Sequence, residues 1–154
     1  MSRMVRLLLA VVALCSIGLA AVPAKAVAPP IAVTTAVRDG VTLNASVLLA
    51  DGSAVLLPGS ALLAVPALAM FDTAGAPSST TSLSTDVWDA VIGSYTTITT
   101  TFDDRLDEDQ RREVSRKHRA TVLDALTDAK REAKDAGVDY DATRAAYDKA
   151  HGRK

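Results

Sequence analysis

Residues Leu106–Ala136 read LDEDQRREVSRKHRATVLDALTDAKREAKDA, stop at Gly137 and carry the start, middle and stop signals of one long helix. Asp107 is placed to cap the first turn, and Gln110 can complete a capping box with it. The interior is rich in Arg, Lys, Glu, Ala and Leu, which favour helix. Gly137 can adopt the left-handed conformation that ends many helices. The sequence therefore predicts a long amphipathic helix over this stretch.

A second, shorter helix is expected directly after Gly137. Asp139 can cap its first turn, and a regular face of aromatic and small residues follows. The connection through Gly137-Val138 is short enough to predict a helical hairpin with coiled-coil-like contact. The first helix would pack in this hairpin through small residues that include Ala129 and Ala133. The face expected on the second helix consists of Tyr140, Thr143, Tyr147 and Ala150.

Residues 27–71 show the alternation with a period of two that is typical of half-buried strands, most clearly in Val41–Leu49. Asp39-Gly40 and Asp51-Gly52 on either side of that stretch are strong hairpin signals, and Pro58-Gly59 is a favourable turn pair. The segment therefore predicts a small antiparallel β-meander. Its expected strands are Ile31–Arg38, Val41–Leu49, Ser53–Leu57 and Ser60–Val65.

The same residues allow a second interpretation, because Ala54–Phe71 contains eighteen residues without a charge. That length is close to what a membrane-spanning or membrane-associated segment needs. Pro58-Gly59 and Pro66 interrupt the run, and acidic rather than basic residues flank it. A strand in the meander is therefore favoured, with membrane association as the alternative.

Residues 72–85 contain Gly, Pro and a Ser/Thr run, and they predict a polar linker. The next stretch, residues 86–102, supports two secondary structures. Apolar side chains from Trp88 to Phe102 recur at helical spacing, which favours helix and extends the helical region over 86–154. Five threonines between Thr96 and Thr101 are β-branched and favour strand instead. We expect helix, with strand as the alternative.

Residues 1–26 have the three parts of a secretory signal peptide. Arg3 and Arg6 form a basic start, Leu7–Val22 is an uncharged apolar run, and Ala24-Lys25-Ala26 fits a cleavage site. Cleavage after Ala26 would give a secreted or periplasmic protein, and an uncleaved membrane anchor is the alternative. Cys15, the only cysteine, lies in this segment, so the mature protein would have no thiol for catalysis or metal binding.

The long helix carries adjacent blocks of opposite charge. Its start is acidic and its middle is basic, which fits either a solvated helix with ion pairs one turn apart or a docking surface for another protein. Such a rod is also complementary to an antiparallel copy of itself, so weak, salt-sensitive self-association is a further expectation. The candidate partner-binding residues are Asp107, Glu108, Asp109, Arg111, Arg112, Arg116, Lys117 and Arg119.

Little in the sequence points to catalysis. His118 lies among basic residues that disfavour its imidazolium form, and His151 lies near the chain end. No metal-ligand spacing or serine-nucleophile motif is present, so we assign no catalytic residue, metal or cofactor. The 17 basic and 18 acidic residues also do not favour nucleic acid as a partner.

Together these patterns predict an α+β protein with an N-terminal antiparallel β-meander, a linker and a C-terminal pair of helices. The expected function is that of an exported, non-enzymatic interaction or structural protein that binds a partner through its charged helices. A membrane-associated protein using residues 54–71 is the first alternative. A small extracytoplasmic hydrolase is the second.

Overall fold

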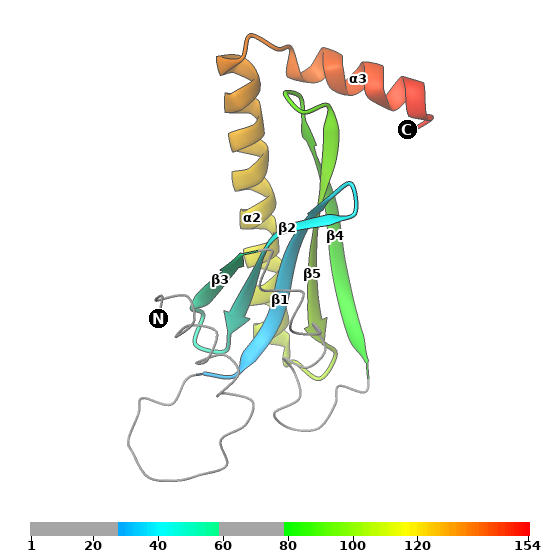
Figure 1. The fold of residues 1–154 in the computed structure, drawn as a ribbon. Coiled ribbons are helices and arrows are strands. Elements are labelled where there is room, and N and C mark those ends of the chain that lie inside the picture. The colour runs from blue at the N-terminus through cyan, green and yellow to red at the C-terminus, as the bar shows by residue number, and fades with distance from the viewer. Residues whose placement is uncertain (1–27, 59–78) are drawn as a thin grey trace, which may run out of the picture.

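The computed structural model describes residues 28–58 and 79–154, and these form an α+β fold. A five-stranded antiparallel sheet is followed by a long helix and a short helix (Figure 1). The strands occur in the sheet in the order β3-β2-β1-β5-β4. The elements are β1 Pro30–Arg38, β2 Val41–Leu49, β3 Ala54–Pro58, β4 Thr80–Asp89, β5 Ser94–Asp103, α2 Glu108–Asp135 and α3 Tyr140–His151.

The first three strands confirm most of the predicted meander, because β1, β2 and β3 pair consecutively and antiparallel. Asp39 and Gly40 connect β1 to β2 with φ values of 50° and 77°. Positive φ at both central residues is the requirement of the type I′ turn that fits a twisted hairpin. In the next turn, the Asp51 carboxylate accepts hydrogen bonds from the backbone N–H and hydroxyl of Ser53. The fourth strand expected at residues 60–65 lies outside the described residues.

The helix expected over residues 86–102 is wrong. The segment forms the end of β4, a turn and β5, which pair as an antiparallel hairpin. Trp88 and Tyr95 are direct cross-strand partners. Their separation in the sequence matches helical spacing only because the chain reverses between them in a hairpin. In the turn, Gly93 has φ 75°. The Asp89 carboxylate accepts hydrogen bonds there from the backbone N–H groups of Val91 and Ile92. The β-branched threonines therefore indicated the correct structure.

The linker and helical-region boundaries also change. Residues 80–85, expected in the linker, belong to β4, while residues 72–78 lie outside the described part of the chain. The helical region starts at Glu108 and not at residue 86. Of the apolar segment 54–71, only residues 54–58 are described, and these pair with β2 as β3. The predicted signal peptide, residues 1–26, also lies outside the described residues.

The long helix α2 begins with the predicted capping box. Asp107 accepts from the Gln110 backbone N–H, and the Gln110 side chain accepts from the Asp107 N–H. At the other end Gly137 has φ 69°, and the Val138 N–H bonds to the carbonyl of Ala133. Both ends of the predicted helix are therefore confirmed to within two residues, because its local signals specify them.

α2 lies along one face of the sheet and is buried against it at two separate places (Figure 1). Near its start, Val114 is fully buried in a cluster from β1, β2 and β5. Near its end, Ala133 is 1% exposed and packs with Trp88 and Ala90. Between these two anchors α2 presents to the sheet His118, which hydrogen-bonds to two strands, and then small side chains that include Ala125 and Ala129. The residues that Val114 packs with are Ile31, Ala32, Leu48 and Phe102.

α3 follows the predicted short connection, but it packs on the β4–β5 hairpin. Its Tyr147 ring lies 4.8 Å from the Trp88 ring, centroid to centroid, and Thr143 accepts from the Trp88 indole N–H at 3.1 Å. Figure 1 shows α3 turning away across the end of the hairpin and not running back along α2. Ala129 and Ala133, which were expected to face α3, instead face the sheet: Ala133 packs against Trp88, and Ala129 lines a groove above the strands. The predicted face of α3 therefore makes packing contacts, but with the β4–β5 hairpin and not with α2.

Candidate functional site

Most of the predicted partner-binding residues gather on one face of α2. Five residues at spacings of three and four, which we call the arginine face, are Arg111, Arg112, Ser115, Arg116 and Arg119. Together with Glu108 they line a shallow depression of about 330 Å³. All four arginines are exposed.

The acidic start of α2 is already engaged within the chain. Glu108 and Asp109 both pair with Arg112, the second at 3.8 Å. Glu113 receives two hydrogen bonds from Arg116, at 2.8 and 2.6 Å. These hydrogen bonds lower the pKa of the Glu113 carboxyl, so the pair stays ionised. The acids therefore orient two guanidinium groups of the arginine face.

The charges of two further arginines of this face are compensated to different extents. Arg111 donates to the backbone carbonyl of Asp104 at 2.5 Å. Hydrogen bonds from Ser79 and Thr81 and, to a smaller extent, the Arg111 charge lower the pKa of the Asp104 carboxyl, so this carboxylate partly compensates Arg111. Arg119 makes no ion pair within the described residues. The four arginines of this face thus stand against three acids of the same helix, Glu108, Asp109 and Glu113. Arg119 supplies most of the positive charge that remains at this face.

The other predicted site residues have different places. The Asp107 carboxylate is occupied by the capping box, so its role is structural. Lys117 does not line the depression, because it lies on a different side of the helix. Ser115 was missed by the sequence analysis. Its spacing of three to four residues from Arg111, Arg112 and Arg119 could have identified it.

A second shallow cleft continues the arginine face toward the sheet. It has a volume of about 240 Å³ and shares Ser115 and Arg119 with the first depression. Its remaining wall is formed by β4 and by His118, which is 6% exposed. The arginine face therefore extends from the start of α2 to the outer strand of the sheet. The β4 residues of this wall are Leu83, Ser84 and Thr85.

His118 joins α2 to the sheet through a chain of side-chain hydrogen bonds. Its Nδ1 lies 2.8 Å from the Thr100 hydroxyl and its Nε2 lies 3.1 Å from the Thr85 hydroxyl. Thr100 in turn bonds to Thr34 at 2.7 Å. Burial lowers the pKa of His118. The direction matches the expectation from the sequence, but desolvation and not the neighbouring basic residues is its cause.

This burial predicts an acid-sensitive fold. Because the native pKa of His118 lies below its ordinary value of 6.5, the unfolded chain binds the proton more readily. The contribution of His118 to stability should therefore be complete above about pH 6.5 and decrease as the pH falls toward its native pKa. Urea unfolding at pH 7.5 and 5.5 measures this. His118→Asn should show a smaller loss of stability between the two pH values than His151→Asn, which alters an exposed histidine. Equal losses in both variants would refute it.

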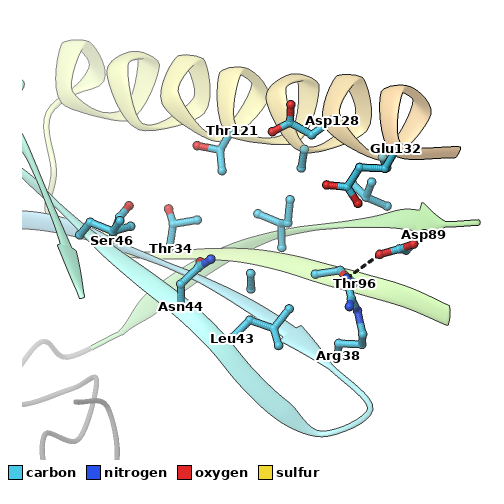
Figure 2. Close-up of a pocket in the computed structure, with 16 residues that line it drawn as sticks. Thr34, Arg38, Leu43, Asn44, Ser46, Asp89, Thr96, Thr121, Asp128 and Glu132 are labelled. Atoms are coloured by element: carbon cyan, nitrogen blue, oxygen red, sulfur yellow. Dashed lines mark hydrogen bonds and ion pairs between the residues drawn. The ribbon is translucent and has the colours of Figure 1, made fainter. Parts of the chain in front are cut away.

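A larger groove lies between the middle of α2 and the sheet (Figure 2). Its volume is about 420 Å³. It exists because Ala125 and Ala129 face the sheet between the two anchors of α2, and they are too short to fill the space. Residues from all five strands line it, so the sequence analysis did not identify it.

The groove has charged residues at one end. Arg38 donates to the Asp89 carboxylate and to the Thr96 hydroxyl, each at 3.0 Å. From α2, Asp128 pairs with Arg131 at 2.7 Å, outside the groove lining. Glu132 also lines the groove and makes no ion pair in the described part of the chain. The strands give the groove a mixed floor, apolar around Val87 and Ile98 and polar at Thr34, Asn44 and Ser46. Glu132 is the one lining carboxylate without an ion pair among the described residues.

Three further observations concern metal binding, membrane-spanning helices and similarity to known proteins. Within residues 28–58 and 79–154, no three His, Cys, Asp or Glu side chains gather so that they could hold a metal ion. No helix in these ranges is both long and apolar enough to cross a membrane. Comparisons of the chain with protein-family models, curated proteins and solved structures gave no match.

Proposed function

We propose that the protein is an exported, non-enzymatic binding protein that holds an acidic protein partner on the arginine face of α2. The observation that carries the proposal is the group of four exposed arginines around one depression. A guanidinium is planar and presents several donors, so it can bind a carboxylate through two parallel hydrogen bonds. Several such groups on one surface fit a partner segment rich in Asp and Glu.

The arginine face is held in a defined position, which favours binding. Val114 and His118 fix the same turns of α2 to the sheet, from roughly the opposite side of the helix to Arg112 and Arg116. Glu108 and Glu113 further restrict those two side chains. A preordered surface loses less conformational entropy when a partner binds. The fold therefore supports this face as a rigid docking surface.

An acidic partner fits better than a second copy of the chain. Antiparallel self-association would need the acidic start of one helix to meet the basic middle of another. Here Glu108 and Asp109 already pair with Arg112 in their own chain, and Asp103 pairs with Arg105. A dimer would have to break or share these contacts. We therefore place homotypic association second and a separate acidic partner first.

A defined acidic peptide tests the proposal. We expect a fluorescein-labelled peptide of ten glutamates to bind with an affinity that decreases as salt increases. The variant Arg112→Gln, Arg116→Gln and Arg119→Gln should bind roughly 3- to 150-fold more weakly, because each of three exposed ion pairs contributes about 0.2–1 kcal/mol. Fluorescence anisotropy measures both effects.

The matched control removes the same number of charges elsewhere. Arg131→Gln, Lys134→Gln and Lys149→Gln change exposed residues at the far end of α2 and on α3. This control should bind the peptide within about twofold of the native protein. Equal weakening in both triple variants would mean that net charge alone attracts the peptide. That result would refute a site on the arginine face.

A further inference from the structure

We propose that the groove beneath α2 is a second binding site, for a small primary amine with an aliphatic body. This ligand class is separate from the acidic partner of the arginine face, and the site uses none of the arginine-face residues. The groove supplies three features that such a ligand needs: a space of suitable size, an apolar part of the floor around Val87 and Ile98, and a carboxylate without an ion pair among the described residues.

The size of the groove fits a small molecule. Its volume of about 420 Å³ lies within the range of roughly 300–1,000 Å³ that is usual for ligand pockets. The space is built into the fold, because Val114 and Ala133 hold α2 against the sheet at both ends. Figure 2 shows the helix above the groove and the strands below it. The small side chains between the anchors therefore leave an open groove between the helix and the sheet.

The floor and mouth of the groove are suited to an aliphatic chain. Ile98 and Val87 are buried in the sheet beneath α2 and form part of the floor. Leu43 and Leu56 lie on β2 and β3 and remain 42% and 70% exposed. Large apolar side chains with this exposure, lining a groove, gain from contact with an apolar ligand. An aliphatic body can thus cover surface that the protein leaves in water.

The charges select the head group. Three acids line the groove and only one base, Arg38. Asp89 is neutralised by Arg38 and Asp128 by Arg131, which leaves Glu132. Figure 2 shows Glu132 reaching from α2 toward the strands at the end where Thr96 lies. A carboxylate beside an apolar floor attracts a cation and repels an anion. A primary ammonium also carries three hydrogen-bond donors, and the Glu132 carboxylate and the Thr96 hydroxyl can accept hydrogen bonds from it.

Three probes of equal chain length test the proposal: hexylammonium, hexanoate and hexanol. We expect hexylammonium to shift the backbone amide NMR signals of groove residues such as Ile98 and Ala129, in a saturable manner. Hexanoate should bind at least about tenfold more weakly, since its charge is repelled. Shortening the amine should weaken binding by at most about fourfold per methylene, the value for complete burial of each group.

Variants then locate the site. Glu132→Gln should weaken hexylammonium binding by about three- to fivefold, as expected for an exposed charge. Asp124→Asn, on the same helix and outside the groove lining, should leave it unchanged. Ala129→Leu should block all three probes by filling the groove, with circular dichroism showing that the variant is folded.

Several results would overturn the proposal. Equal binding of hexanoate or hexanol would show that the groove does not select a cation. An unchanged affinity in Glu132→Gln would remove the residue that carries the argument. Shifts that map to the arginine face, or no saturable shift at millimolar amine, would exclude the groove as the site. If Ala129→Leu fails to fold, the affinities of Glu132→Gln and Asp124→Asn for hexylammonium still decide whether the amine binds in the groove.

Discussion

Trp88→Ala is expected to lower the free energy of unfolding by about 3–5 kcal/mol and to release α3 from the strands. Trp88 is 2% exposed and lies where β4, α2 and α3 meet. Its ring packs against Tyr95 and Tyr147 with centroid distances of 5.0 and 4.8 Å, and its N–H donates to Thr143. The substitution removes all these contacts together and leaves a cavity at the end of the hairpin.

Urea unfolding and amide hydrogen exchange measure the two parts of this prediction. The conservative variant Trp88→Phe should lose less stability, because it retains an aromatic ring in the cluster. In Trp88→Ala, the amides of residues 140–151 should exchange faster than those of the middle of α2, since α3 depends on this cluster. A loss below about 1 kcal/mol, with α3 still protected, would contradict the packing described for α3.

Val114→Asp is expected to destabilise the protein by about 3–5 kcal/mol, and more if the carboxylate stays ionised in the core. Val114 is fully buried and packs among apolar side chains of the sheet. This anchor fixes the start of α2 to the sheet. Its loss should therefore also weaken binding of the acidic peptide, because the arginine face would no longer be held in place.

Leu123→Asp provides the matched control on the same helix. Leu123 is 61% exposed, so the same change in charge there should cost less than about 1 kcal/mol. Thermal and urea unfolding of the two variants give the comparison. Similar losses in both would mean that charge on α2, and not burial at the anchor, determines stability.

The parts of the fold that could be predicted from the sequence depend on short-range physical signals. The Asp107–Gln110 capping box specifies where α2 begins, and Asp39-Gly40 specifies a hairpin turn. Both act within a few residues of chain, so no tertiary information is needed. The residues between Trp88 and Phe102 were misassigned because two strands of a hairpin brought apolar residues into a helical spacing by coincidence. In that stretch, the β-branched threonines and Gly93 indicated the strands and the turn, whereas the apolar spacing indicated a helix.

The same distinction separates the two candidate sites. The arginine face consists of neighbours on one helix, so the spacing in the sequence was sufficient to group most of it. The groove beneath α2 combines residues from five strands and the helix. Its existence depends on β1 lying between β2 and β5, and on two anchors near opposite ends of α2. None of these long-range relationships can be read from local periodicity.

The most direct test of the central claim is to map where an acidic partner binds. Amide NMR spectra of the native protein, recorded during titration with the ten-glutamate peptide, give this at residue resolution. We predict that the shifts concentrate on residues 108–119 and the adjoining part of β4, and that they decrease as salt increases. Shifts centred on α3, or spread evenly over all basic residues, would contradict a docking site on the arginine face.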